Sequence, residues 1–377
     1  MPSKVKIITF YLPQYHAIPE NDLWWGKGFT DWKNVKKSKP RYFGHYQPQI
    51  PSELGYYDLT DEKSRNSQAE LAKEYGITGF CYYHYWFNGK MLLEKPFDEV
   101  LQSKKPDFQF CLCWANENWT RRWDGLDSEI LMEQKYEDYN AEEHINWLSN
   151  AFKDARYIKV NGRPLFLIYN VNSIPNLKER VGQWREFTKK NGFKDIYLCT
   201  VKSIHNRLTD AEAINVGFDA VVEFIPGSSS VIPRKIMGYP RYYFYKSINI
   251  LLDCFKLSKY FKKLPLTIIQ DYRKFALSNI NRKKSPYNVF PCVIPSWDNS
   301  ARKNLSASIQ NNDPELFKQW LNSSIKEVSE NPDDEKIVFI NAWNEWAEGC
   351  HLEPDLRNGR MFLEAVKQAL EMESSSN

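Results

Sequence analysis

The stretch KIVFINAWNEWAEG, residues 336–349, joins a run of apolar and aromatic residues to two glutamates, Glu345 and Glu348, which are three residues apart. A continuously apolar run of this kind is typical of a parallel strand that is buried on both faces. Glutamates at this spacing are also common on the solvated faces of helices. Here they follow the predicted strand directly and lie among tryptophans and a glycine, which favours a functional site.

Seven further apolar runs, rich in β-branched and aromatic residues, precede this stretch in the 377-residue chain. The eight predicted strands are 5–11, 79–86, 108–114, 164–169, 196–201, 220–225, 289–294 and 336–343. Helical patterns lie between many of them, at 61–76, 140–155, 177–192, 313–332 and 360–372. Asp61 and Asp313-Pro314 are start signals, and Gly192 is a stop signal.

This alternation of strands and helices predicts parallel βαβ units. Eight strands with a closing helix indicate an α/β fold of the (β/α)₈ TIM-barrel type, and we expect residues 1–377 to form a single such domain. The alternative is an open, doubly wound sheet. The chain contains neither the GxGxxG nor the GxxxxGK[ST] turn that would support a nucleotide site in such a sheet.

Residues 228–287 form a basic stretch between the sixth and seventh predicted strands. They include thirteen Lys and Arg but two Asp, a net charge of +11, whereas the whole chain carries +4. The stretch is too long for a simple barrel connection, so we interpret it as an elaborated excursion. Its mixture of bulky apolar residues and cations from Tyr242 to Lys263 resembles helices that lie at a membrane surface. The alternative is a helical excursion packed on the barrel with a solvated basic face.

Composition argues against several other classes of protein. A net charge of +4 is too small to indicate a nucleic-acid partner, and no stretch approaches eighteen apolar residues. The first sixteen residues lack the apolar core of a signal peptide, and seven cysteines without repeated spacing are typical of reduced thiols. We therefore expect a cytoplasmic protein, with peripheral contact at the inner membrane surface as a further hypothesis. No spacing of His, Asp or Glu predicts a metal site, and we expect no cofactor.

Catalytic groups of a TIM barrel lie at the carboxyl ends of its strands, and polar and aromatic residues collect at those ends in this chain. Amides and carboxylates can hold sugar hydroxyls, and aromatic rings can stack on the apolar face of a sugar. Each of three candidates also has a structural alternative. His84 could be a core histidine, Arg121 could pair with nearby acids, and Asp298 could cap a loop. The candidates for substrate binding are Tyr11, Gln14, His84, Trp86, Trp114, Asn116, Glu117, Arg121, Asp298, Asn344 and Trp346.

Glu345 and Glu348 are the candidate catalytic residues. If one carboxylate is ionised, the proton of its neighbour is harder to remove, so the two pKa values separate. The pair can then supply one base and one acid near neutral pH, as glycoside chemistry requires. A Gly-x-Ser-x-Gly elbow, the usual mark of a serine hydrolase, is absent from the sequence.

Five long motifs resemble the WbsX-type proteins of bacterial O-antigen and capsule gene clusters, a family similar to glycoside hydrolase family 99, the endo-α-mannosidases and mannanases. The resemblance extends from Lys4 to about Leu370. It implies a (β/α)₈ barrel. The motifs are ITFYLPQYH (8–16), WWGKGFTDW (24–32), GITGFCYYHYWF (76–87), CLCWANENWTRRWDG (111–125) and FINAWNEWAEGCHLEPD (339–355).

The likeness to family 99 is most specific at NEWAEG, residues 344–349. It implies that Glu345 is a base acting on the 2-hydroxyl of the sugar, whose oxygen attacks the anomeric carbon to give a 1,2-anhydro sugar. Glu348 would protonate the leaving group and then activate water, so that configuration is retained. This differs from the common retaining mechanism, in which a carboxylate is the nucleophile.

Three functions remain open from the sequence. The first is a retaining endo-acting glycosidase or transglycosidase that acts on an O-antigen or capsule polysaccharide or on its lipid-linked precursor. The second is a glycosyltransferase of polysaccharide biosynthesis, dependent on a nucleotide sugar. The third is a barrel that binds glycans without turning them over. Binding of a nucleotide sugar would favour the second, and indifference to substitution of both glutamates would favour the third.

Overall fold

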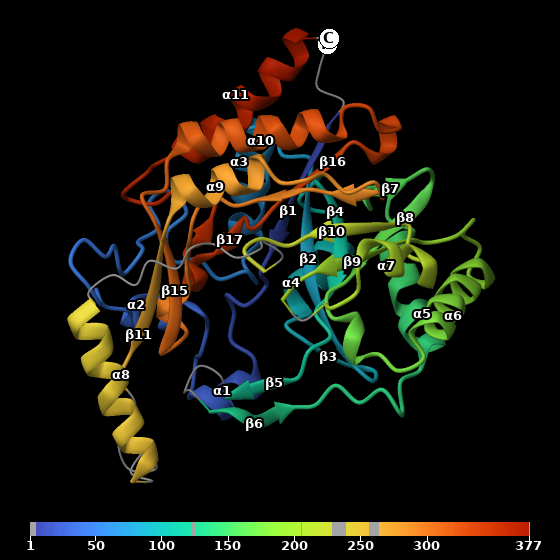
Figure 1. The fold of residues 1–377 in the computed structure, drawn as a ribbon. Coiled ribbons are helices and arrows are strands. Elements are labelled where there is room, and N and C mark those ends of the chain that lie inside the picture. Colours follow the sequence, from blue (N-terminus) through green and yellow to red (C-terminus); the bar gives the residue numbers. More distant parts are fainter. Residues whose placement is uncertain (1–4, 122–125, 205, 228–238, 256–263, 377) are drawn as a thin grey trace.

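Parallel strands surround the centre of the molecule in a computed structural model that describes residues 5–121, 126–204, 206–227, 239–255 and 264–376 (Figure 1). All eight predicted strands are present. They are β1 (Lys6–Tyr11), β2 (Gly79–Phe87), β4 (Gln109–Trp114), β8 (Arg163–Ile168), β9 (Tyr197–Lys202), β10 (Ala220–Glu223), the pair β12 (Val289–Phe290) and β13 (Cys292–Val293), and β16 (Ile337–Ile340).

The seventh strand is divided in two, and its halves join the two ends of the sheet. The order is β12-β10-β9-β8-β4-β2-β1-β16-β13, with every neighbouring pair parallel. Val289 pairs with Val221 on one side, and Cys292 pairs with Phe339 on the other. Pro291 lies between the halves and has no N–H to donate to a ladder, so the strand is interrupted there. The predicted (β/α)₈ barrel is confirmed.

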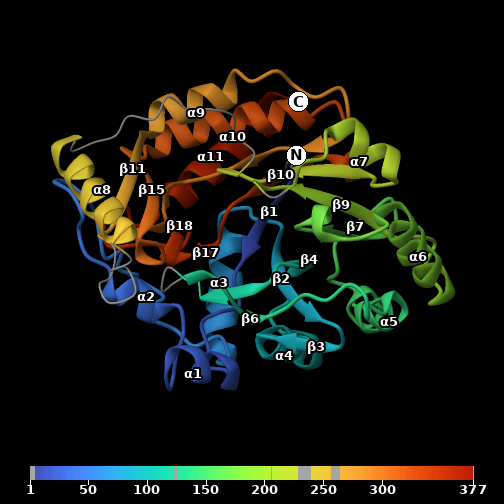
Figure 2. The same ribbon diagram turned by 60° about the horizontal axis from the view of Figure 1, so that its bottom comes forward.

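Helices surround the strands, and several begin where the sequence predicts (Figure 2). The side chains of Asp61, Asn140 and Asp313 accept hydrogen bonds from the first free N–H groups of their helices. Pro314 occupies the first turn, where its missing N–H does no harm. The surrounding helices are α3 (Glu62–Glu74), α4 (Lys95–Ser103), α5 (Ala141–Phe152), α6 (Leu177–Lys190), α7 (Asp210–Val216), α9 (Tyr272–Ile280), α10 (Pro314–Val328) and α11 (Met361–Ser376).

Aromatic side chains fill the inside of the barrel. The ring of Phe10 on β1 lies 5.7 Å from Tyr83, 5.2 Å from Phe224 and 5.4 Å from Phe339, measured between centroids. Phe10 and Phe339 are fully buried. The interior is therefore a packed core, and whatever binds to the barrel must do so above this layer.

The loops at the carboxyl ends of the strands form the mouth of the barrel, which is at the bottom of Figure 1. α1 (Pro19–Trp25) and α2 (Trp32–Lys37) follow β1, and the hairpin of β5 (Trp119–Arg121) and β6 (Leu126–Met132) follows β4.

Short strands also lie outside the barrel sheet or pair with one of its strands. Apart from β11, described below, they are β3 (Lys90–Leu92), β7 (Lys159–Val160), β14 (Trp297–Asp298), β15 (Leu305–Gln310), β17 (Asn344–Glu345) and β18 (Cys350–His351).

The basic excursion lies between β10 and β12, as predicted. Its described part contains α8 (Tyr239–Cys254), β11 (Leu266–Asp271) and α9, while residues 228–238 and 256–263 lie outside the described residues. β11 pairs in parallel with β15, which pairs with β14, so the excursion adds a small sheet beside the mouth. α9 returns to the barrel, where Phe275 packs against Trp320 of α10. No helix in the described ranges combines the length and the apolar character of a membrane span.

We predict that Gly79→Ala destabilises the barrel, because β2 approaches β4 too closely there for a side chain. A Cβ at Gly79 would lie 2.7 Å from the carbonyl oxygen of Gln109 and 2.8 Å from Ile158 Cδ1. We expect a loss of about 1–3 kcal/mol, measured by urea unfolding. The control is Gly182→Ala in the middle of α6, where nothing lies within 4 Å and alanine should stabilise by about 0.5–1 kcal/mol. Equal effects of the two substitutions would contradict the prediction.

Candidate active site

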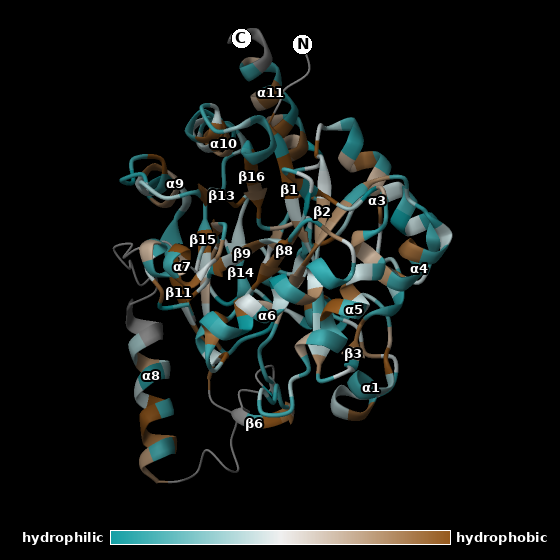
Figure 3. Cartoon of the chain, turned by 90° about the vertical axis from the view of Figure 1, so that its right-hand side faces the viewer, coloured by the Kyte–Doolittle hydropathy of each residue, from teal (hydrophilic) through white to brown (hydrophobic). Residues whose placement is uncertain are grey.

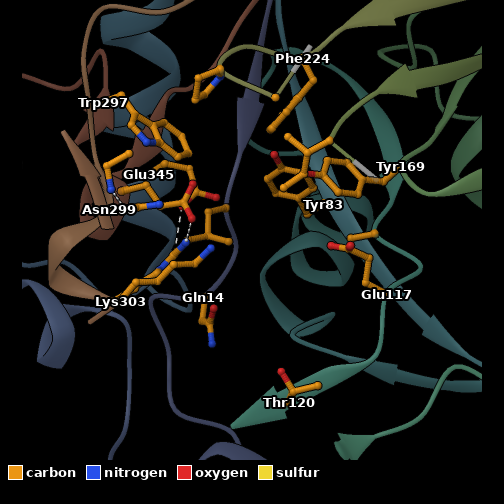
Figure 4. Close-up of a pocket in the computed structure, with 18 of the residues that line it drawn as sticks. Gln14, Tyr83, Glu117, Thr120, Tyr169, Phe224, Trp297, Asn299, Lys303 and Glu345 are labelled. Atoms are coloured by element: carbon orange, nitrogen blue, oxygen red, sulfur yellow. Dashed lines mark hydrogen bonds and ion pairs between the residues drawn. The ribbon is translucent and has the colours of Figure 1, made fainter. Parts of the chain in front are cut away.

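A cavity of about 980 Å³ opens at the mouth of the barrel (Figure 4). Glu345, Asn299 and Lys303 lie on one wall, and Tyr83, Tyr169 and Glu117 lie on the wall that faces them. Further aromatic residues lining the cavity are Trp25, Tyr85, Trp119, Phe224, Phe275 and Trp297. The cavity thus combines aromatic faces with a few carboxylates, amides and cations, a composition suited to a sugar chain.

Glu345 and Glu348 project into this cavity from one turn of backbone. β16 ends at Ile340, Asn344–Glu345 form β17, and Trp346–Glu348 form a single 3₁₀ turn. Glu345 precedes the turn and Glu348 ends it, and both carboxylates extend to the same guanidinium group, that of Arg302. Both residues line the cavity, with Glu345 the more deeply buried, at 7% side-chain exposure against 20% for Glu348.

Gly349 ends this turn with a backbone conformation and surroundings that favour glycine. Its φ is +54°, in the left-handed region. A Cβ there would lie 2.5 Å from Gln49 Nε2 and 2.9 Å from Asp298 Cβ. The turn that presents the two glutamates therefore lies directly against Gln49 and Asp298, with no room for a side chain between them.

One guanidinium group faces three carboxylates at the base of the site. Arg302 Nη2 lies 2.5 Å from Asp31 Oδ2 and 3.0 Å from Glu345 Oε2, while Nη1 lies 3.0 Å from Glu348 Oε1. Asp31 is fully buried and comes from the loop after β1, and Arg302 follows β14. Ion pairs thus connect three separate loops of the mouth, and carboxylates outnumber the cation around which they gather.

Burial raises the pKa of Glu345 from its ordinary value of 4.5 to about 8. Arg302 opposes this rise, whereas the negative charges of Glu348 and Asp31 add to it. Arg302 itself keeps its proton, since the three carboxylates raise its pKa well above its usual range despite burial. In the free protein at neutral pH, Glu345 is therefore the member of the cluster that holds a proton in most molecules.

Asn344 and Trp346, both predicted to bind substrate, lie behind the cavity wall and hold the turn in place. Asn344 accepts a hydrogen bond from the Leu12 N–H and donates one to the Leu12 carbonyl, at 2.8 and 3.0 Å. Trp346 Nε1 donates to Glu353 Oε2 at 2.6 Å, and its ring stacks on His351 at 3.7 Å between centroids. These contacts connect the glutamate turn to the loop after β1.

Glu353 is a buried carboxylate that organises this support. Besides the Trp346 indole, it accepts hydrogen bonds from Gln68 Nε2 at 2.6 Å and the Tyr57 hydroxyl at 2.8 Å. Burial raises its pKa to about 7, while these donors lower it. The carboxylate is enclosed by its donors and is absent from the cavity lining, so it acts on the site through Trp346 and through Tyr57, whose hydroxyl also accepts from Asn344 at 3.4 Å.

Two of the other predicted binding residues, Gln14 and Glu117, line the cavity, whereas several lie on the outer side of the barrel wall. Tyr11 donates a hydrogen bond to Gln68 on α3 at 2.7 Å. His84 lies 3.0 Å from His144 Nε2, Trp86 stacks on His144, and the Trp114 indole donates to the carbonyl of Trp86. Burial lowers the pKa of His84 to about 3, as expected of the core histidine that was its alternative role.

The last three predicted binding residues make contacts near the mouth but do not line the cavity. Asn116 donates to Tyr136 and to the Asn170 carbonyl, at 2.7 and 2.6 Å. Asp298 accepts from His45 Nε2 at 2.5 Å and from the Ser300 N–H. Arg121 Nε lies 2.7 Å from Glu129. The sequence alternatives of a loop-capping Asp298 and an acid-paired Arg121 match these contacts.

Sequence reasoning missed Tyr83, Tyr85 and Asp31. Side chains of a strand alternate between its faces, so once His84 and Trp86 point outward, Tyr83 and Tyr85 must point into the barrel. Both line the cavity. The sequence shows this alternation, but it does not show which of the two faces of the strand points into the barrel. Nothing local distinguishes Asp31, whose partner Arg302 is 271 residues away.

A TIM barrel with a glutamate pair in an aromatic-lined cavity at its mouth defines a class of protein whose site is suited to carbohydrates. Family membership follows from the sequence: the chain belongs to the family described as Glycosyltransferase WbsX, whose model matches residues 7–366. The resemblance to the WbsX-type proteins is confirmed.

Curated relatives match nearly the whole of this chain, and solved structures share its fold. Two proteins named "Uncharacterized protein WxcX", from two strains of Xanthomonas campestris pv. campestris, are 38% identical over 369 residues. The match covers 97% of this chain and 49% of each relative, so the chain spans about half the length of these relatives. The fold is similar to that of the GH99 endo-α-mannosidase from Bacteroides thetaiotaomicron in complex with BIS-TRIS-Propane, with a TM-score of 0.57 at 12% identity over 100% of this chain and 99% of that one. A "Glycoside hydrolase-like protein" also gives 0.57, at 14% identity over 98% and 94%.

We predict that Glu345→Gln stabilises the protein at high pH. Because the pKa of Glu345 is raised from 4.5 to about 8, the folded state binds more protons than the unfolded state between these values. Stability from this group is full below pH 4.5 and is lost as the pH rises through about 8. The amide has no proton to lose, so the gain in melting temperature over wild type should be larger at pH 9 than at pH 5.

The control for this measurement is Glu179→Gln on the exposed side of α6. It makes the same chemical change without burial, and its effect should be small and similar at both pH values. If Glu345→Gln changed the melting temperature equally at pH 5 and pH 9, the prediction that Glu345 holds a proton in the folded state would be wrong.

Proposed function

We propose that the protein is a retaining, endo-acting glycosidase or transglycosidase whose substrate is a bacterial surface polysaccharide, such as O-antigen or capsule, or its lipid-linked precursor. One observation carries this proposal: Glu345 and Glu348 extend from a single turn into the cavity and share Arg302 at 3.0 Å each. Two carboxyl groups in different environments are what acid and base catalysis at a glycosidic bond requires.

The shape of the cavity supports an extended glycan substrate. At about 980 Å³ it lies at the upper end of the usual range for ligand sites, about 300–1,000 Å³. Trp25, Trp119 and Trp297 line it at separate points and offer faces for several sugar rings. We propose that Gln14 and Glu117, which line the same space, hold sugar hydroxyls, with Lys303 available to an anionic group.

In the proposed reaction, ionised Glu345 takes the proton of the substrate 2-hydroxyl while O2 attacks C1 and the bond from C1 to the leaving oxygen breaks. Glu348 gives its proton to that oxygen. Water, or the hydroxyl of an acceptor sugar, then attacks C1 and passes its proton to Glu348. The bond from C1 to O2 breaks, and Glu345 returns the proton to O2. Two displacements at C1 retain its configuration.

Arg302 and Asp31 have a positioning role in this scheme. The guanidinium, which also lines the cavity, holds both carboxylates in place, and its charge favours the ionised form of Glu345. Asp31 keeps Arg302 in place through its own ion pair at 2.5 Å. Substrate that enters from the mouth therefore meets two oriented carboxyl groups rather than flexible side chains.

We predict that the wild-type protein, without any nucleotide, releases fragments from the surface polysaccharide of the organism that encodes it, as read by mass spectrometry. Glu345→Gln and Glu348→Gln should each lower the rate by about 10²–10⁴-fold, because each removes a group that transfers a proton. The matched control is Glu117→Gln, the same change on the facing wall, which we expect to raise KM more than it lowers kcat.

Two outcomes would contradict the glycosidase. Turnover that appears only when a nucleotide sugar is supplied would establish the second candidate function, a glycosyltransferase, which the description of the matching family favours. Binding of glycan that is unchanged in both glutamine variants, without turnover under any condition, would establish a non-catalytic glycan-binding barrel. In either case the barrel fold would be unaffected, but the proposed catalytic roles of Glu345 and Glu348 would be wrong.

The pH dependence of kcat/KM tests whether the reactive free enzyme holds one proton on the glutamate pair. The proposed reaction needs one ionised and one protonated glutamate, so kcat/KM should fall above about pH 8, where the pair loses its last proton. A kcat/KM that stays level from about pH 8 to about pH 10 would contradict a reaction that needs a protonated glutamate.

A further inference from the structure

Helix α8 extends beside the mouth of the barrel and reaches the same side of the molecule as α1 and β6 in two views at right angles (Figures 1 and 3). α1, β5 and β6 contribute Trp25, Thr120 and Leu131 to the lining of the cavity. β11, which follows α8 along the chain, contributes Gln270. The helix therefore stands beside the mouth and is joined through β11 to the lining of the cavity.

The outer face of α8 is apolar. Its exposed large side chains, each between 50% and 69% exposed, are Tyr243, Phe244, Ile250 and Leu251, with Phe255 just beyond its end. At 100° per residue these five side chains occupy a single arc of the helix, together with Ser247 and Cys254, which are also exposed. Figure 3 shows the hydrophobic colouring along the lower half of the helix.

The inner face of α8 makes the contacts with the rest of the molecule. Asn249 is buried there, and its side chain donates to the Leu264 carbonyl at 2.9 Å and accepts from the Leu264 N–H at 2.8 Å. Ile248 and Leu252 on this side are half-buried. On α8 the exposed face is mainly apolar, whereas α9 of the same excursion packs on the barrel and exposes Arg273 and Lys274.

We propose that the outer face of α8 is a docking surface for an anionic membrane, and that it brings the mouth of the cavity to the lipid surface. Charge favours this occupant: residues 239–263, which include α8 and the residues that follow it in the sequence, contain six Lys and Arg and one Asp, a net charge of +5. Anionic lipid headgroups attract such a segment, while the apolar arc enters the headgroup boundary. Two copies pairing through α8 would instead bring two strongly basic segments together, which is unfavourable.

Lys246 fits the same arrangement. It is exposed and lies three residues after Tyr243 and four before Ile250, beside the apolar arc. A lysine at the edge of such an arc can extend its ammonium group to lipid phosphates while its stem covers apolar surface. The contact is peripheral, and it stands apart from the proposed reaction, because vesicle binding requires no glycan.

The test is co-sedimentation of the wild-type protein with vesicles of phosphatidylcholine that contain phosphatidylglycerol, compared with phosphatidylcholine alone. We expect binding to the anionic vesicles at low salt and its loss at high salt. Leu251→Glu places a charge in the centre of the arc and should weaken binding on the order of ten-fold or more. Leu356→Glu, at another exposed leucine outside α8, is the matched control and should change binding little.

A second measurement uses a cysteine that is already in the arc. Of the seven cysteines, all of which lie in the described ranges, Cys254 is exposed and the other six are buried. A polarity-sensitive dye attached to Cys254 should shift its emission to the blue when anionic vesicles are added. This readout places the contact at α8, and it does not depend on any substitution.

Several outcomes would overturn the proposal. Absence of binding to anionic vesicles at low salt would exclude the membrane, and equal losses in Leu251→Glu and Leu356→Glu would exclude the apolar arc as its contact. A dimer in solution that Leu251→Glu dissolves, without vesicle binding, would assign the face to a second copy of the chain. Activity on soluble polysaccharide tests the proposed function separately, since Leu251 lies outside the catalytic cavity.

Discussion

The Arg302 guanidinium, buried among Asp31, Glu345 and Glu348, is the interaction on which the mouth of this barrel depends. A buried charge is tolerated only if it is paired, and here the one cation pairs with carboxylates from two loops, so that three loops far apart in the sequence are joined. Burial, together with the negative charges of Glu348 and Asp31, raises the pKa of Glu345 to about 8 against the opposing charge of Arg302, so Glu345 holds a proton at neutral pH. The same cluster therefore holds the loops together and sets the protonation state of a cavity-lining carboxyl group.

The alternation of side chains along the strands explains how the rest of the molecule supports this cluster. Inward-pointing aromatics such as Phe10 and Tyr83 fill the barrel and form the floor of the cavity. Outward-pointing residues of the same strands, such as Tyr11 and His84, fasten the strands to the surrounding helices. Adjacent residues of one motif thus lie on opposite faces of the barrel wall, one facing the cavity and the other facing the helices. A motif taken as a whole therefore does not show which of its residues face the cavity.

The sequence predicted the barrel well, since long apolar runs and helix caps such as Asp61 and Asp313 are local signals. It also located the glutamate pair, because the pair directly follows the last strand. It was less informative about binding residues. His84 and Trp86 were predicted to bind substrate, but their neighbours Tyr83 and Tyr85 line the cavity. The alternation of side chains along a strand can be read from the sequence, whereas the face that points inward depends on how the barrel closes. The apolar outer face of α8 was likewise not evident from the mixture of apolar residues and cations around it.

The sequence by itself determined the eight barrel strands, five of the helices, their order and the place of Glu345 and Glu348 after the last strand, because each of these follows from residues within a few positions of one another. The tertiary structure alone decided that Asp31 and Arg302, separated by 271 positions, meet at 2.5 Å, and that the pKa of Glu345 rises to about 8. The physical reason is that burial and Coulomb interactions act through space, so the charge state of a carboxyl group depends on neighbours that only folding brings together.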